Sequence, residues 1–120
     1  MEQIVFETMV NYNEYIERIK LNINPLIESL REEKPEEQLN EVANLIEGLE
    51  WLVTVNQKLS ELNYENKIDV SSLNQQLQEV VVAIENQDYN LCADILEYDI
   101  LETIQAYQPY QPYNLEGEIK

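Results

Sequence analysis

The feature of the sequence that most constrains its fold is an apolar stripe near the amino terminus. Apolar or amphipathic side chains recur there at alternating intervals of four and three residues, which is the repeat of an amphipathic helix. Because the repeat runs unchanged through Pro25, it predicts one long helix over about residues 3–33, bent where the proline removes a backbone hydrogen bond. The alternative is that Asn24 caps a second, separate helix. The stripe comprises Val5, Met9, Tyr12, Ile16, Ile19, Ile23, Leu26 and Leu30.

A second helix is predicted after Pro35. Proline suits the first turn of a helix, and the two glutamates that follow it favour a helix amino terminus. The apolar face continues to about residue 62, with Gly48 as a tolerated weak point. The helical period is lost over residues 63–70, which predicts a loop.

The carboxyl-terminal half predicts two more helices. The third covers about residues 70–86, and either Asp69 or Ser71 caps it. The fourth follows a turn at residues 86–88 and runs to about Tyr107. Because its apolar arc is broad, we expect it to be the most enclosed helix.

These elements predict an all-α fold, an up-down-up-down four-helix bundle with two long and two shorter helices. We place the bundle domain at residues 1–107 and an extended tail, rich in proline, tyrosine and glutamine, at residues 108–120. Tyr107, Tyr110 and Tyr113 recur every third residue, so on a polyproline helix their rings share one side. They could be a ligand for an aromatic groove, dock on the chain's own bundle or on a dimer mate, or stay disordered.

The unequal helix lengths predict an uncovered apolar surface. At about 1.5 Å per residue, the first helix spans roughly 45 Å and the third only about 26 Å. We therefore expect the hairpin end of the first two helices to project beyond the bundle and bind a second copy of the chain. If the chain breaks at Pro25 instead, the same residues fold back and become ordinary core. Trp51 is either a further interface anchor or the edge of the core. The candidate interface residues of the hairpin are Ile23, Leu26, Ile27, Leu30, Leu39 and Val42.

The composition excludes most familiar catalytic chemistry. The chain has no histidine, one cysteine and two glycines far apart, which excludes His-based hydrolases, His-ligated metal sites and glycine-rich nucleotide loops. We predict no catalytic, cofactor-binding or metal-binding residue and no enzymatic activity. Residues 68–119 contain ten acidic residues and no Lys or Arg, which argues against direct nucleic-acid binding.

The same sequence favours a cytoplasmic protein that binds no membrane. The amino terminus has no basic stretch followed by a long apolar core, so we expect neither a signal peptide nor a membrane span. Cys92 is the only cysteine and cannot form an internal disulfide, which agrees with a reducing compartment. On an apolar face with acidic neighbours, it is expected to be an inert thiol with a raised pKa.

The most distinctive stretch of the chain runs from Asp88 to Ile100. It reads Asp-Tyr-Asn-Leu-Cys-Ala-Asp-Ile-Leu-Glu-Tyr-Asp-Ile, and a looser match lies in the Gly-Leu-Glu-Trp-Leu segment at Gly48 to Leu52. This stretch resembles a motif of small acidic helical proteins of Firmicutes bacteria whose function is uncharacterised. The resemblance implies no activity.

Carboxylates close together on the fourth helix define a candidate acidic face. They could bind a cation or a basic peptide, or they could be a solvated helix face. Asp99 is expected to be half-buried among apolar side chains. Its cationic partner would come from the first helix, as Arg18, Lys20 or Arg31. The residues of the candidate acidic face are Asp94, Glu97, Tyr98 and Glu102.

The formal net charge of −17 and the predicted bundle favour a non-enzymatic protein-protein interaction module that self-associates as a homodimer. One alternative is a secretion-chaperone-like holder of an export substrate, which needs an open groove for amphipathic segments. The other is an acidic mimic of nucleic acid that occupies a basic site on another protein. Besides a second copy, the expected partner is a basic or amphipathic protein segment.

Overall fold

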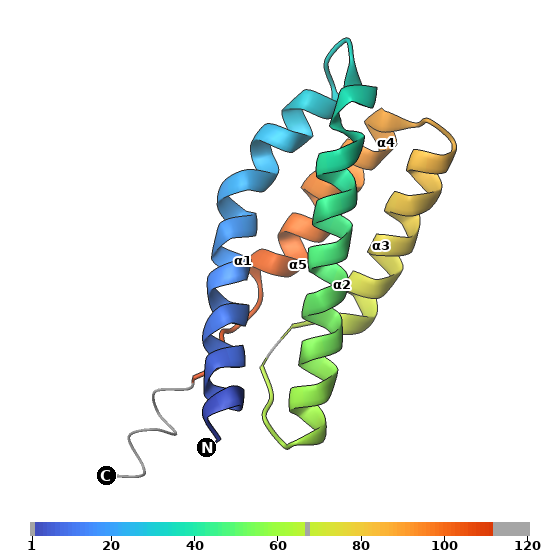
Figure 1. Ribbon diagram of the computed structural model, residues 1–120. Helices are drawn as coiled ribbons and strands as arrows, with labels where there is room; N and C mark the ends of the chain where they lie inside the picture. Colours follow the sequence, from blue (N-terminus) through green and yellow to red (C-terminus); the bar gives the residue numbers. More distant parts are fainter. Residues whose placement is uncertain (1, 67, 112–120) are drawn as a thin grey trace.

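Four helical segments run up, down, up and down along one long axis (Figure 1). A computed structural model describes residues 2–66 and 68–111. The predicted all-α four-helix bundle is confirmed, although the last segment contains a π-helical turn that was not predicted. In chain order the elements are α1 (Gln3–Leu30), a 3-10 turn (Pro35–Gln38), α2 (Leu39–Glu61), α3 (Val70–Glu85), α4 (Tyr89–Asp94), the π turn (Ile95–Ile100) and α5 (Leu101–Gln105).

The long first helix continues through its proline, as predicted. Pro25 lies inside α1 and is exposed. The carbonyl of Leu21 is the group that loses its helical hydrogen bond, and the Leu21 residue is 77% exposed. Because water can reach this side of the helix, it can replace the lost bond, and the helix does not break.

Single polar residues, two aspartates and one asparagine, mark the ends of the other helices. Asp69 caps α3 by accepting a hydrogen bond from the backbone N–H of Ser72 at 3.0 Å, which decides between the two predicted caps. Asp88 caps α4 in the same way, with the N–H of Leu91 at 3.1 Å. Asn63 follows α2 with a φ of 69°, a left-handed conformation that asparagine adopts more readily than most residues.

One face of every helical segment contributes to a single core. Among the residues that the structure describes, nine side chains have no exposed surface, and the segment after Asp88 supplies four of them, in keeping with its broad apolar arc. Burial of such side chains contributes about 1.5–3 kcal/mol each and is the main force holding the bundle together. The nine are Tyr12, Ile16, Leu49, Leu52, Val80, Cys92, Ala93, Ile100 and Ile104.

The expectation that the hairpin end of α1 and α2 projects uncovered is wrong. The connection after α2 climbs back along the bundle before α3 begins, so α3 and α4 extend to the hairpin end (Figure 1). α4 packs directly on α1. Four of the six hairpin residues are at most 3% exposed, and these four are Ile23, Ile27, Leu30 and Val42. Leu26 is half-buried and Leu39 is 38% exposed. The stripe is thus core of its own chain, and the reason to expect a dimer at this end is removed.

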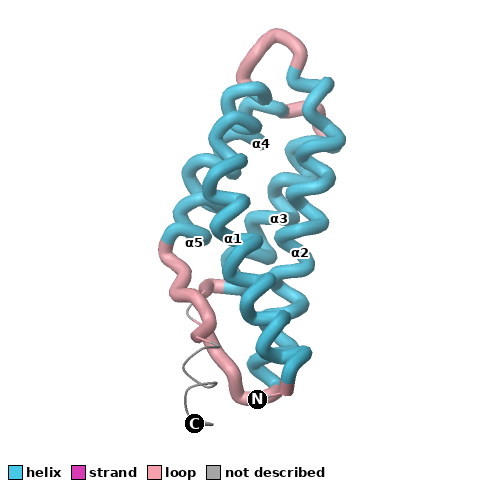
Figure 2. Tube along the Cα trace, turned by 60° about the vertical axis from the view of Figure 1, so that its left-hand side comes forward, coloured by secondary structure: helices cyan, strands magenta, loops and turns pink. Residues whose placement is uncertain are grey.

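The opposite end of α1 is covered by the segment that follows α5. Figure 2 shows this segment leaving α5 and running along the bundle toward the amino-terminal end of α1. Tyr107 is 8% exposed and Tyr110 is 4% exposed, so these two tail tyrosines dock on the bundle of their own chain. Tyr113 lies outside the described residues.

Candidate functional site: a groove between α3 and α4

The structure brings three of the four predicted acidic-face residues together around one cation. Nη2 of Arg31 lies 2.9 Å from Oδ1 of Asp94 and 3.2 Å from Oε1 of Glu97. Tyr98 follows Glu97 directly, and this carboxylate raises the pKa of its phenol. Glu102 is exposed and lines a neighbouring hollow instead.

The ion pairs set the charge of this cluster. The hydrogen bond with Asp94 raises the pKa of Arg31, which therefore stays cationic. The neighbouring Glu97 raises the pKa of Tyr98, whose phenol therefore stays neutral at physiological pH. The expectation that Asp99 is half-buried and takes a cation from α1 is wrong, because Asp99 is exposed and Arg31 pairs with the other two carboxylates.

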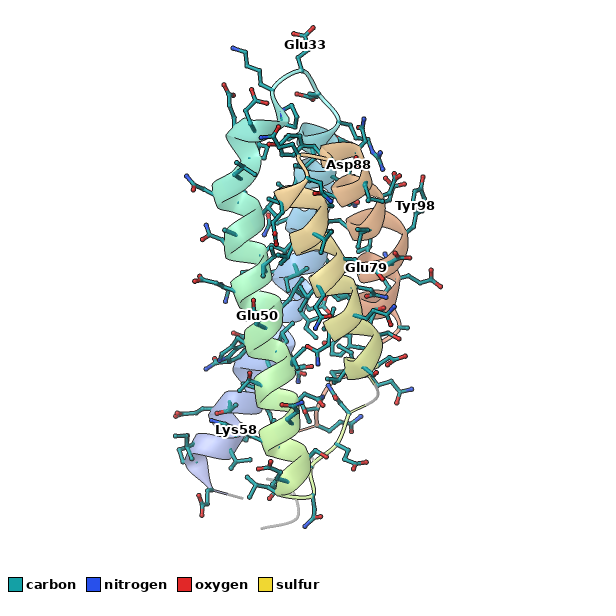
Figure 3. All side chains as sticks on the ribbon, turned by 90° about the vertical axis from the view of Figure 1, so that its right-hand side faces the viewer. Glu33, Glu50, Lys58, Glu79, Asp88 and Tyr98 are labelled. Carbon is teal, nitrogen blue, oxygen red and sulfur yellow. The ribbon has the colours of Figure 1, made fainter. Side chains whose placement is uncertain are left out.

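A groove of about 630 Å³ lies between α3 and the last helical segment. Its apolar floor is formed by Val82, Leu91, Ile95 and Tyr98. Three of these are unusually open, since Val82 is 55%, Leu91 45% and Tyr98 60% exposed. Figure 3 shows Tyr98 projecting away from the bundle, with Glu79 on the neighbouring face of α3. A cluster of exposed apolar side chains on one side of a monomer commonly marks an interaction site.

The rim of this groove is polar and acidic. It consists of Gln75, Gln78, Glu79, Asp94 and Asp99. Tyr98 and Asp99 also line the adjoining hollow of about 350 Å³, so they stand between the two depressions. The residues that line the two depressions include no Lys or Arg, in keeping with the sequence of residues 68–119.

Sequence reasoning missed the floor of the groove. The broad apolar arc of the fourth helix includes Leu91 by its spacing, yet this residue is 45% exposed. A signal did exist in the run Val80-Val81-Val82, because three successive residues cannot all face the core from one helix. Val80 is buried and Val82 is exposed, and Ala83 takes the next core position.

Trp51 lies at the edge of the core and keeps an exposed face. Its ring centroid lies 5.9 Å from that of Tyr15 and 6.3 Å from that of Tyr12, and the residue is 40% exposed. The hydroxyl of Tyr15 lies over Gly48, where an added Cβ would be 1.5 Å away. Glycine at this position therefore makes room for the Tyr15–Trp51 contact.

We expect Gly48→Ala to leave the free energy of unfolding nearly unchanged in the natural chain. Alanine favours a helix by about 1 kcal/mol over glycine, but Tyr15 must move, and the loss of its edge-to-face contact with Trp51 costs about 0.5–1.5 kcal/mol. In a Tyr15→Ala background the same substitution should stabilise by about 1 kcal/mol. Urea unfolding of the four variants measures both effects, with Trp51 emission reporting the ring contact. Equal stabilisation in both backgrounds would show that Tyr15 does not occupy this space.

The expectation for Cys92 is confirmed. The side chain is fully buried, and burial raises the pKa of its thiol from 9.0 to about 11. Thiolate, which is the reactive form, is scarce at neutral pH. The residue is therefore a packing thiol.

The buried thiol and the buried tyrosine hydroxyls predict a loss of stability at alkaline pH. Burial raises the pKa of Cys92 from 9.0 to about 11 and that of Tyr107 from 10.0 to about 12. Burial also raises the pKa of Tyr110. Below the pKa values of the unfolded chain, the folded and unfolded states both keep these protons. Between those values and the higher pKa values of the folded protein, only the unfolded state releases them. Stability is therefore lost as pH rises through the folded pKa values.

We therefore expect the urea midpoint to be level up to about pH 9 and to fall from there to about pH 12. Cys92→Ala should remove the part of the fall that belongs to the thiol, between about pH 9 and 11. A level profile across this range in the natural chain would contradict the burial of these groups in solution.

Fold and site together define a class, that of acidic all-α bundles with a docked tail and one apolar, acid-rimmed groove. The chain belongs to the family described as "Domain of unknown function (DUF8042)", whose model matches residues 7–110. Comparison with curated proteins gave no match, and neither did comparison with solved structures. Among the described residues, no helix is long and apolar enough to cross a membrane, and no group of three or more Cys, Asp or Glu side chains is placed to hold a metal ion.

Proposed function

We propose that the protein is a non-enzymatic, cytoplasmic protein-interaction module that binds a basic amphipathic helix of a partner protein in the groove between α3 and α4. One observation carries the proposal: Val82, Leu91 and Tyr98 form an exposed apolar floor inside an acidic rim. The lone buried thiol of Cys92 supports the location, since reducing compartments keep thiols free.

Charge complementarity selects the chemistry of the occupant. A helix with leucines on one face and lysines beside them would bury the leucines on the floor and bring its cations to the rim. The carboxylates of Glu79 and Asp99 lie at the rim, where those cations arrive, whereas Asp94 already pairs with Arg31. Such pairing speeds association and weakens as salt is added. A second copy of this chain does not fit here, because it would bring carboxylates against carboxylates.

The apolar floor also separates this proposal from the other functions considered. A mimic of nucleic acid needs rows of carboxylates, and Val82 and Leu91 interrupt them here. A secretion-chaperone-like holder would use the same groove for the same kind of segment. The ligand chemistry, an amphipathic helix with basic flanks, is common to that role and to any other adaptor role.

The test uses a synthetic helical peptide of leucine and lysine with all leucines on one face. We expect it to shift the NMR signals of Val82, Leu91 and Tyr98 in the full chain and to bind roughly tenfold more weakly when salt is raised to about 0.5 M. A scrambled peptide of the same composition controls for net charge. Equal binding of both peptides would reduce the interaction to bulk charge and contradict the proposal.

Charge-neutral variants localise the interaction. Val82→Gln with Tyr98→Gln should weaken peptide binding roughly tenfold, because the apolar floor is lost while the acidic rim is kept. The matched control is Leu21→Gln, which changes an exposed apolar side chain outside the groove. Binding that is insensitive to the double variant would place the peptide elsewhere on the protein.

A further inference from the structure

The contacts that hold the tail form a second site, between α1, α2 and the connection to α3. The side chain of Asn13 grips the main chain of Tyr110 twice: its Nδ2 donates to the Tyr110 carbonyl at 2.8 Å, and its Oδ1 accepts from the Tyr110 N–H at 3.0 Å. This is the pair of bonds that one β-strand offers another. It recognises extended backbone whatever the side chain.

The ring of Tyr110 gives the site its side-chain preference. The residue is 4% exposed, and its ring meets that of Tyr12 edge to face, with 5.0 Å between centroids. Its hydroxyl accepts a hydrogen bond from Nδ2 of Asn56 at 3.1 Å, and Asn56 also bonds to Asn66 in the connection. The two hydrogen bonds from Asn13, which form a backbone clamp, and the pocket around the ring together select a tyrosine in an extended segment.

The tail contains this ligand twice. Gln108-Pro109-Tyr110 is followed at once by Gln111-Pro112-Tyr113. Proline fixes its own φ and holds the preceding residue extended, so a Pro-Tyr unit is already shaped for the clamp. Each chain therefore has one pocket and two successive units that match it.

We propose that the pocket of Tyr12, Asn13 and Asn56 is a binding site for extended Pro-Tyr segments, and that its second occupant is the tail of another copy of this chain. In the exchanged form, the tail of each copy leaves its own pocket and places a Pro-Tyr unit in the pocket of the other copy. Reciprocal exchange closes a two-fold dimer and needs neither the hairpin end nor the α3–α4 groove. The dimer is independent of the function proposed above.

Two physical factors set the conditions for exchange. A tethered tail has an effective concentration on the order of millimolar at its own pocket, so the exchanged form is expected only in concentrated protein. The net charge of −17 opposes the approach of two copies, and added salt screens it. Added salt thus promotes tail exchange, whereas it weakens the binding of a partner helix in the α3–α4 groove. Because the two effects have opposite signs, one proposal can fail without the other.

A complementation experiment tests the exchange with full-length chains. The donor copy is Asn13→Ala, with a weakened pocket and an intact tail. The acceptor copy is Tyr110→Ala with Tyr113→Ala, which has a pocket but no ligand. We expect each copy alone to stay monomeric by light scattering, and the concentrated mixture to gain a component of twice the mass that increases with salt. A monomeric mixture of two copies with native circular dichroism would overturn the proposal.

A second measurement needs no substitution and so does not depend on the folding of variants. Isotope-labelled and unlabelled natural chains are mixed at high concentration, and NOEs are filtered for contacts between chains. Contacts between the Tyr12 ring of one copy and a tail tyrosine of the other are expected. Tyr12 contacts confined to the tail of the same chain would overturn the exchange.

Discussion

Replacing Leu30 by alanine should lower the free energy of unfolding by about 2–5 kcal/mol, the range for a leucine removed from a well-packed core. Leu30 is the last residue of α1 and is 1% exposed as part of the single core. Urea unfolding followed by circular dichroism measures the change. The substitution tests directly whether this end of the hairpin is covered in solution.

The matched control is Leu21→Ala on the same helix. Leu21 is 77% exposed, so its truncation should change stability by no more than about 0.5 kcal/mol. If Leu30→Ala were as mild as Leu21→Ala, the hairpin end would be uncovered in solution. Light scattering of the natural chain would then show whether a second copy covers it.

Tyr110→Ala should cost about 3 kcal/mol, although Tyr110 lies outside every helix. The truncation removes a buried ring from its contact with Tyr12 and removes the hydroxyl that accepts a hydrogen bond from Asn56. Tyr110→Phe retains the ring and loses only the bond to Asn56, so about 1 kcal/mol is expected. The free energies come from urea unfolding monitored by far-ultraviolet circular dichroism.

A double-mutant cycle with Asn13→Ala adds a sharper test. Once Tyr110→Ala has released the tail, Asn13 no longer hydrogen bonds with residue 110. In that background, Asn13→Ala should therefore change the free energy of unfolding very little. Strictly additive effects would mean that Asn13 stabilises the protein through contacts other than the two hydrogen bonds to Tyr110.

The sequence carried enough information for the helices because their signals are local. The heptad stripe through Pro25, the cap at Asp69 and the loop after α2 each depend on neighbours within a few positions. The course of that loop depends on distant packing instead. Helix lengths alone predict that the hairpin end around Leu30 is uncovered, whereas the climbing connection brings α3 and α4 to this end and Leu30 is buried.

The candidate site was predictable only in part. The spacing of Asp94, Glu97 and Tyr98 placed them together correctly, because all three lie within one turn of a helix. Arg31 is 66 residues from Glu97, and no periodicity links the two. The π turn and the clamp on Tyr110 likewise depend on tertiary contacts rather than on a local pattern.

The grip of Asn13 on Tyr110 spans 97 positions of the chain. On the ribosome, α1 and α2 are made before Tyr110. The ring of Tyr12 and the amides of Asn13 and Asn56 stay without this partner until Tyr110 has been made. A nascent chain that has not yet reached Tyr110 therefore carries an open tyrosine pocket beside its first helix.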